Sequence, residues 1–127
     1  MIVVDASAAV LGLLRDGTAR SLLGTETVAA PFLIDVEIAN ALRNRVHRGH
    51  VDAGTARQAL HVWESLVIAY HPGTELLDRI WQLRDNLSAY DALYVAVAES
   101  LECGLLSADE RLARAPGPSC PIEVATT

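Results

Sequence analysis

Residues 1–14 read MIVVDASAAVLGLL, and this stretch decides the fold. Residues 2–4 form a compact apolar run that is typical of a buried strand. Asp5 then opens an apolar helical stretch that continues to Leu14, because an Asp side chain accepts hydrogen bonds from the first turn of a helix. A buried strand that passes directly into a helix predicts a parallel sheet, since parallel strands need helical crossovers.

The same alternation of strand and helix continues along the chain. Hydrophobic periodicity and turn residues predict helices at 18–23, 33–48, 52–66, 88–102 and 108–114, a helix capped by Thr74, and strands at 26–30, 67–70, 105–106 and 122–124. Pro31 is expected to stop the second strand, and the last strand is expected at an edge. The pattern predicts an α/β fold, a three-layer α/β/α sandwich with a small, mainly parallel central sheet. We expect a single domain over residues 1–127.

Composition excludes several classes of protein. The net charge of -6 argues against a broad basic surface for nucleic acid, although it leaves room for a local site. All ten basic residues are Arg, so the chain lacks the lysine of P-loop enzymes, of Schiff-base enzymes and of phosphate-receiving regulatory domains. Apolar runs are far shorter than the roughly 20 residues that cross a membrane. Without a secretory signal at the N-terminus, we expect a cytoplasmic protein.

Four acidic residues follow or flank the predicted strands: Asp5, Glu37, Asp91 and Asp109. In a parallel α/β sheet the strand-to-helix junctions lie along one edge, where ligands bind, so we expect these carboxylates to meet there. Each one alone also has a structural explanation. Ser88 to Asp91 and Ser107 to Glu110 fit capping boxes, and Glu37 shares a polar helix stripe with two asparagines.

Together the four carboxylates point to a bound cation. Several carboxylates within about 5 Å of one another repel unless a cation lies between them. Oxygen ligands suit Mg²⁺, for which Mn²⁺ can substitute, better than they suit Zn²⁺. The sequence adds no paired His or Cys ligands: the four histidines lack metal-ligand spacing, and Cys103 and Cys120 form no C-x-x-C pair and are interpreted as reduced, small apolar residues.

Four segments carry a resemblance to a known family. They are VVDAS at 3–7, VEIAN at 36–40, AYDALYVA at 89–96 and LSADERL at 106–112. Together they look like a PIN domain, and their order and spacing resemble the VapC toxins of bacterial VapBC toxin–antitoxin pairs over essentially the whole chain. The resemblance implies a type II toxin: a metal-dependent ribonuclease that hydrolyses RNA phosphodiester bonds by means of a metal-activated water.

The resemblance also implies a role for individual residues. Asp5, Asp91 and Asp109 would hold the main ion, and Glu37 would orient a second ion or the attacking water. The polar residues expected to orient these ligands are Ser7, Asn40 and Ser107. Two residues after the last Asp, where some members carry a further acid, this chain has Arg111.

Partners follow from the same resemblance: an RNA substrate, a cognate VapB-type antitoxin that blocks the site, and a second copy of the chain in a homodimer. The residues expected to contact RNA phosphates are Arg43, Arg45, Arg48 and Arg111. The first three end a predicted helix, so they equally fit cations that complement the helix dipole. Trp63, Trp81, Tyr90 and Tyr94 are interpreted as core or interface anchors, with base stacking as the alternative.

Two other functions stay open from sequence alone. A PIN-type nuclease in RNA maturation, or one acting on structured DNA, would use an identical set of acids. A catalytically weak regulatory or binding module could keep every acid as a helix cap. A phosphate-receiving signalling domain also gathers acids at strand ends, but it needs a lysine that this chain lacks.

Overall fold

The computed structural model describes residues 1–126, so Thr127 lies outside the described residues. Its strands are β1 (Ile2–Val4), β2 (Val28–Pro31), β3 (Ile68–His71), β4 (Gly104–Ser107) and β5 (Ile122–Val124). They form one sheet in the order β3-β2-β1-β4-β5, and every pairing is parallel. Val3 in the central strand is in register with Ala29 of β2 on one side and with Leu105 of β4 on the other. The prediction of a parallel central sheet is confirmed.

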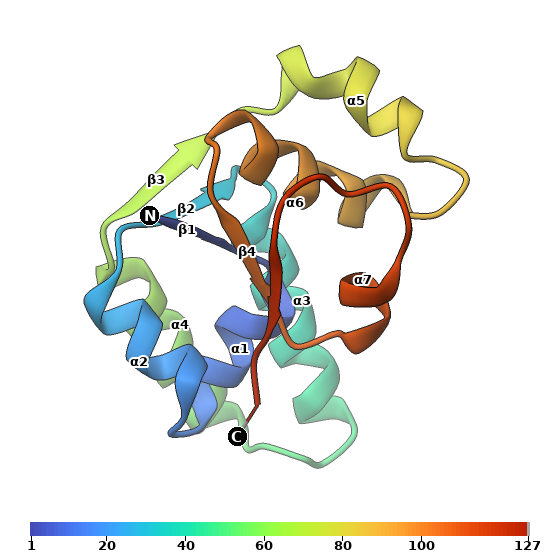
Figure 1. Ribbon diagram of the computed structural model, residues 1–127. Helices are drawn as coiled ribbons and strands as arrows, with labels where there is room; N and C mark the ends of the chain where they lie inside the picture. Colours follow the sequence, from blue (N-terminus) through green and yellow to red (C-terminus); the bar gives the residue numbers. More distant parts are fainter. Residues whose placement is uncertain (127) are drawn as a thin grey trace.

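Helices cover both faces of this sheet (Figure 1). They are α1 (Ala6–Leu14), α2 (Thr18–Thr25), α3 (Ile34–His47), α4 (Ala53–Ser65), the 3-10 helix η1 (Thr74–Leu76), α5 (Leu77–Gln82), α6 (Ala89–Ser100) and α7 (Glu110–Arg114). From β1 the chain adds β2 and then β3 on one side of the sheet. It then crosses back to the other side of β1, where β4 and β5 lie. Right-handed crossovers therefore place α1 to α4 on one face and α5 to α7 on the other. This arrangement is the predicted three-layer sandwich.

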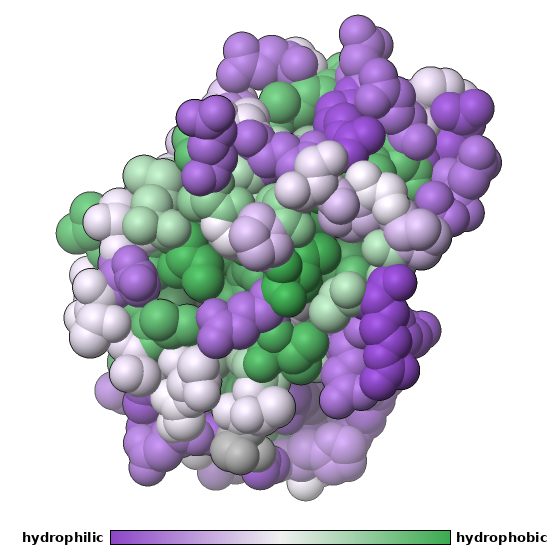
Figure 2. Space-filling model, viewed as in Figure 1, coloured by the Kyte–Doolittle hydropathy of each residue, from purple (hydrophilic) through white to green (hydrophobic). Residues whose placement is uncertain are grey.

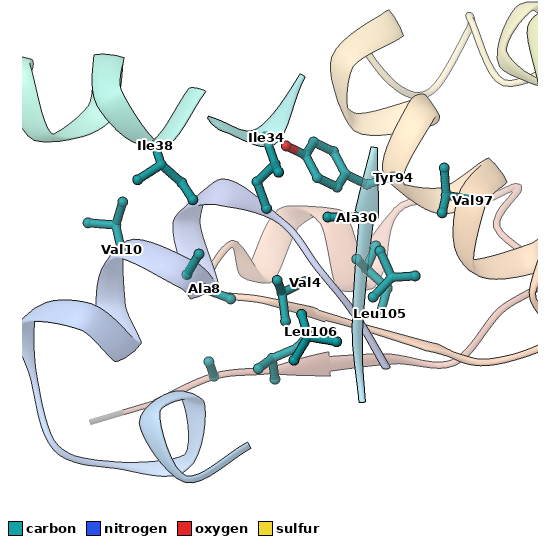
Figure 3. Close-up of a cluster of buried hydrophobic side chains, with 14 of the residues drawn as sticks. Val4, Ala8, Val10, Ala30, Ile34, Ile38, Tyr94, Val97, Leu105 and Leu106 are labelled. Atoms are coloured by element: carbon teal, nitrogen blue, oxygen red, sulfur yellow. The ribbon is translucent and has the colours of Figure 1, made fainter. Parts of the chain in front are cut away.

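The core lies between the sheet and the helices of each face, as Figure 3 shows for a cluster of buried side chains. Val4 of β1 and Leu106 of β4 are completely buried, as are Ile38 of α3 and Val97 of α6. Strands buried on both faces are expected to be almost continuously apolar, which explains why β1 and β4 show no polar alternation. The core thereby fixes the ends of β1 and β4, which Asp5 and Asp109 follow.

Three local predictions were wrong. The second strand was expected to end before Pro31, but Pro31 is itself the last residue of β2 and is in register with His71. Its missing N–H is tolerated because Phe32 donates to the His71 carbonyl oxygen on the β3 side, while pairing with β1 extends only to Ala29. Thr74 was expected to cap a helix, but it is the first residue of η1, which follows Gly73 at a positive φ of 85°.

The third correction concerns the start of α7. Ser107 was expected to begin a capping box, but it is a buried residue of β4, and Asp109 is the N-cap residue of α7. The Ser107 hydroxyl instead accepts a hydrogen bond from the Asp109 N–H at 3.0 Å. The acidic side chain, not the hydroxyl, thus caps the helix.

Apolar surface is left uncovered. Figure 2 shows apolar side chains gathered across the face that β5 crosses, bordered by hydrophilic ones. Elsewhere, Trp81 and Tyr90 are exposed, whereas Trp63 and Tyr94 are buried, so the four aromatic residues divide between surface and core. Among the described residues, no helix is long and apolar enough to span a membrane.

Candidate functional site

The carboxyl ends of β1 and β4 form the centre of the candidate site. The chain runs from β1 to β2 in one direction across the sheet and later returns to β4 on the other side of β1. The adjacent strands β1 and β4 therefore send their chains to opposite faces, and the point between them is where ligands bind in open parallel sheets. Asp5 directly follows β1, and Asp109 lies two residues after β4.

Asp5 is buried and firmly held. Its side chain is only 6% exposed, and Oδ1 accepts hydrogen bonds from the Ala8 N–H at 2.9 Å and from the Ser7 hydroxyl at 2.6 Å. Asp5 is thus the N-cap residue of α1. Burial raises the pKa of its carboxyl above the ordinary value, although hydrogen bonds from Ser107, Ser7 and Ala8 oppose this rise.

Ser7 and Ser107 connect the two strand ends. The Ser7 hydroxyl accepts a hydrogen bond from the Ala108 N–H at 3.0 Å and lies 3.4 Å from the Ser107 hydroxyl. Because Ser7 also donates to Asp5, one short network links the start of α1 to the turn that carries Asp109. The two serines were expected to orient the acids, and their contacts fit that role.

Glu37 is in the first turn of α3 and is held by a tyrosine from α6. The Tyr94 hydroxyl donates a hydrogen bond to Glu37 Oε1 at 2.6 Å. Figure 3 shows the Tyr94 ring reaching from α6 toward Ile34 at the start of α3. Burial raises the pKa of the Glu37 carboxyl, as do the charges of Asp5 and Asp91, while the bond from Tyr94 lowers it.

Asp91 is in the first turn of α6, where its backbone N–H donates to the Ser88 hydroxyl at 3.2 Å. Ser88 is thus the predicted cap of this helix. Burial raises the pKa of the Asp91 carboxyl, followed by the charges of Asp5 and Asp109, while Ser88 and Arg111 lower it. Asp91 consequently experiences the negative charge of two other predicted site residues.

Asp109 differs from the other three acids because a cation accompanies it. Its Oδ1 accepts from the Arg111 N–H at 2.9 Å, and the Arg111 guanidinium lies 3.3 Å from each carboxylate oxygen. The Arg111 hydrogen bond lowers the pKa of the Asp109 carboxyl below its ordinary value. Arg111, expected to contact RNA, forms this ion pair while its side chain stays 91% exposed.

The four acids are electrostatically connected. Asp5 is affected by the charge of Asp109, Glu37 by those of Asp5 and Asp91, and Asp91 by those of Asp5 and Asp109. Among residues 1–126, however, no three His, Cys, Asp or Glu side chains are already arranged to hold a metal ion. The carboxylates therefore share one region without forming a closed ligand set.

The remaining predicted residues lie farther along α3. Asn40 is one turn after Glu37 and is exposed, and within residues 1–126 no hydrogen bond joins it to the acids. Arg43 donates to the neighbouring Asn44 side chain at 3.3 Å. Arg45 and Arg48 are at the end of α3, about 12 to 17 Å along the helix axis from Glu37 at 1.5 Å per residue. They lie outside the acidic cluster.

Sequence reasoning missed the part that Tyr94 has in this site. Tyr94 was interpreted as a core or interface anchor, and its ring is indeed only 2% exposed. A buried tyrosine, unlike a phenylalanine, brings a hydroxyl that needs a partner. Its position three residues after Asp91 places it on the same face of α6. Those two signals together could have identified it.

The chain is thus an α/β domain with a parallel sheet whose carboxyl edge carries a group of acidic side chains. Comparison with known proteins agrees with this description. The PIN domain matches residues 2–118. Ribonuclease VapC9 of Mycobacterium tuberculosis is 49% identical over 124 residues, which cover 98% of each chain. Ribonuclease VapC1 of the same species is 41% identical and covers 96% of each. The chain therefore belongs to the PIN-domain family, in its VapC branch.

A solved structure supports the same fold. The crystal structure of a Pyrobaculum aerophilum protein superposes with a TM-score of 0.72 at 29% identity, covering 97% of this chain and 83% of that one. A likeness of this extent indicates that the overall fold is shared along nearly the full chain. The family resemblance seen in the four sequence segments is confirmed.

Proposed function

We propose that this chain is a metal-dependent ribonuclease and the toxin component of a type II toxin–antitoxin system. The observation that carries the proposal is the gathering of Asp5, Glu37, Asp91 and Asp109 at the carboxyl edge of the sheet, where Asp109 acts on Asp5 and Asp91, and Asp5 and Asp91 act on Glu37. Nearly half of all positions are identical to a VapC ribonuclease over 98% of the chain, which supports RNA as the substrate. The domain proposed to carry this activity is the single unit 1–127.

The donor set fits a hard divalent cation. All four predicted ligands offer carboxylate oxygens, which Mg²⁺ and Mn²⁺ prefer. Burial, and in second place the charges of neighbouring acids, raise the carboxyl pKa values of Asp5, Glu37 and Asp91, and a bound cation would favour their charged forms. Asp5, Asp91 and Asp109 would hold the main ion, and bound Mg²⁺ would supply an activated water and neutralise charge on the phosphate. Because no three acids are arranged in advance, we expect side-chain rotation on binding.

The chain's own residues would divide the remaining work. Asp5 is locked by Ser7 and the Ala8 N–H, so it would serve as the fixed ligand. Glu37, held by Tyr94, would orient the attacking water and accept its proton. Ser107, which joins the turn at Asp109 to this network, would keep the acids of β1 and β4 in register.

The proposed partners are RNA, a VapB-type antitoxin and a second copy of the chain. VapBC2 from Rickettsia felis, solved bound to a promoter DNA fragment, has the same fold at 14% identity and a TM-score of 0.71, and covers 99% of this chain and 100% of that one. RNA phosphates would contact the proposed basic residues Arg43, Arg45, Arg48 and Arg111. Asn40 is also proposed to orient the metal ligands. The proposed location of the protein is the cytoplasm.

The decisive test separates a metal ligand from a helix cap. Asp5 caps α1 and Asp52 caps α4, where Asp52 accepts from the Thr55 N–H at 2.8 Å. Asn is as good an N-cap as Asp, so Asp5→Asn and Asp52→Asn both keep the cap and remove the charge. We expect Asp5→Asn and Asp91→Asn to lose at least about 100-fold in RNA cleavage, whereas Asp52→Asn keeps full cleavage.

The assay uses the purified full chain with Mn²⁺ or Mg²⁺ and with EDTA, alongside melting curves for each variant. Cleavage that depends on the metal and disappears in Asp5→Asn with little change in Tm supports the proposal. Cleavage that persists in EDTA would contradict metal dependence. Equal activity in Asp5→Asn and Asp52→Asn would show that both carboxylates act only as caps, and would favour a binding module.

A further inference from the structure

Two cysteines lie just before the adjacent strands β4 and β5 and line one cavity, at the end of the sheet remote from the acids. Leu105 of β4 is in register with Ile122 of β5, and the Leu105 N–H donates to the Pro121 carbonyl oxygen at 2.9 Å. Cys103 and Cys120 each precede these paired residues by two positions, just outside β4 and β5.

The strands that begin just after these cysteines are neighbours, and their usual spacing is compatible with a disulfide bond. Neighbouring strands lie about 4.8 Å apart, and the Cα atoms of a disulfide are usually about 4.4 to 6.8 Å apart. Both thiols line one cavity of about 470 Å³, together with Glu99, Glu102 and Ser119. Both cysteines are reduced and partly exposed in the structure. A small oxidant therefore has access to two thiols that already face the same space.

Both cysteines are anchored to the end of α6. The Cys103 N–H donates to the Ala98 carbonyl oxygen at 3.0 Å. Next to Cys120, the Ser119 N–H donates to Glu99 Oε2 at 2.7 Å, and the same carboxylate receives two hydrogen bonds from the Arg79 guanidinium. With both backbone segments tied to one helix, a bond between the thiols requires little rearrangement.

We propose that Cys103 and Cys120 are a thiol-oxidation site that closes reversibly into an intramolecular disulfide. The oxidant is a low-molecular-weight disulfide such as oxidised glutathione. One protein thiolate attacks it, forms a mixed disulfide and releases one small thiolate. The second protein thiolate then attacks the protein sulfur of the mixed disulfide, which forms the Cys103–Cys120 bond and releases the second small thiolate. The two protons lost by the cysteines are taken up by the two released thiolates.

The reduced form is the resting state. Burial raises the pKa of the Cys103 thiol, and burial together with the charge of Glu99 raises that of Cys120. Fewer thiolates then form at neutral pH, which slows exchange until an oxidant accumulates. The closed loop, residues 103–120, contains β4, α7 and the acid Asp109. The bond would therefore restrain the segment that carries part of the proposed site, from the opposite end of the sheet.

The test treats the reduced full chain with oxidised glutathione and measures intact mass, thiol alkylation and Tm. We expect a monomer lighter by two hydrogen atoms, with both thiols protected from alkylation and a Tm higher by about 5 °C or more, all reversed by dithiothreitol. Cys103→Ser and Cys120→Ser should each carry one glutathione instead. Wild-type protein that carries two glutathiones, forms covalent dimers or keeps two alkylatable thiols would overturn the proposal, and none of these outcomes depends on RNA cleavage.

Discussion

At the scale of single residues, the four acids of the site differ in whether a cationic side chain is paired with the carboxylate. Asp109 has Arg111, and its carboxyl pKa is lowered. Asp5, Glu37 and Asp91 are partly or largely buried near one another, and the pKa of each carboxyl is raised. Burial is the main cause of the rise at all three carboxyls, and the charges of neighbouring acids add to it. A site of this kind stores unfavourable charge that a bound cation removes.

This stored charge predicts a pH dependence. The folded-state pKa of Glu37 is raised above the ordinary value of 4.5, so the folded chain binds that proton more tightly than the unfolded chain. Its contribution to stability is complete below pH 4.5 and is lost as the pH rises through the folded pKa. In metal-free protein, Glu37→Gln should therefore be more stable than wild type at pH 7, with a difference that vanishes toward pH 4.

Urea unfolding at a series of pH values in EDTA measures this effect. Gln at position 37 keeps an oxygen that can accept the Tyr94 hydroxyl, so only the charge changes. Glu64→Gln, which removes an exposed carboxylate on α4, is the matched control and should show no such trend. A Glu37→Gln variant that is less stable than wild type at pH 7 would contradict the idea of stored charge.

The Tyr94 hydroxyl gives a second prediction at this scale. Tyr94→Phe keeps the buried ring but removes the donor that lies 2.6 Å from Glu37 Oε1. We expect a stability loss of about 1 kcal/mol, as is typical for one hydrogen bond. Cleavage or Mn²⁺ affinity should also fall by about 10-fold or more, because residues that orient ligands commonly have such effects.

Melting, Mn²⁺ titration and cleavage assays on Tyr94→Phe measure these two effects separately. Tyr90→Phe is the control, since the Tyr90 ring is on the same helix but 60% exposed. Reduced stability with unchanged metal affinity and cleavage would mean that the hydroxyl is only part of the core.

At the scale of helices and strands, the sequence predicted every strand and most helix starts. Apolar runs such as the one before Asp5 are local signals, and so are caps such as Ser88 and Asp52. Pro31 was placed wrongly because its tolerance depends on which neighbouring strand has ended, which is a tertiary property. The sequence likewise indicated that Asp5 and Asp109 approach one another, and it placed Tyr94 on the Asp91 face of its helix, but the choice of Glu37 as the partner of the Tyr94 hydroxyl depends on how α3 and α6 pack.

The close approach of α1 and α2 gives a prediction about packing. A Cβ atom at Gly12 would lie 2.8 Å from Leu23 Cδ1 and 3.0 Å from backbone atoms of Ala19 and Arg20. Backbone cannot move aside as a side chain does, so Gly12→Ala should destabilise the chain by about 1 to 3 kcal/mol despite the better helix propensity of Ala.

Gly24→Ala in α2 is the matched control for Gly12→Ala. A Cβ atom there would have nothing within 4 Å. The substitution should stabilise the chain by about 0.5 to 1 kcal/mol, the usual gain when Ala replaces Gly in an exposed helix. Urea unfolding of both variants is the measurement, and equal effects at the two positions would show that α1 and α2 do not pack as closely as described.

At the scale of the whole molecule, an acidic chain must bring a polyanion to an acidic site. The net charge is -6, so long-range attraction to RNA is absent and binding depends on local cations. The segment from Arg43 to Arg48 is the densest basic stretch; it begins a little under two helical turns beyond Glu37 and ends about three turns beyond it. That spacing would place it on phosphates neighbouring the scissile one, rather than on the reacting phosphate.

This arrangement predicts how binding responds to salt. Each phosphate contact in single-stranded nucleic acid contributes about -0.7 to the slope of log affinity against log salt. Replacing Arg45 and Arg48 by Ala should therefore weaken RNA binding and make the slope shallower by about 1.4. The double variant Arg15→Ala/Arg57→Ala removes the same charge from exposed positions on other elements and should leave the slope nearly unchanged. If both variants give the wild-type slope, the arginines of α3 serve only to complement the helix dipole, and RNA must be held by other groups nearer the acids.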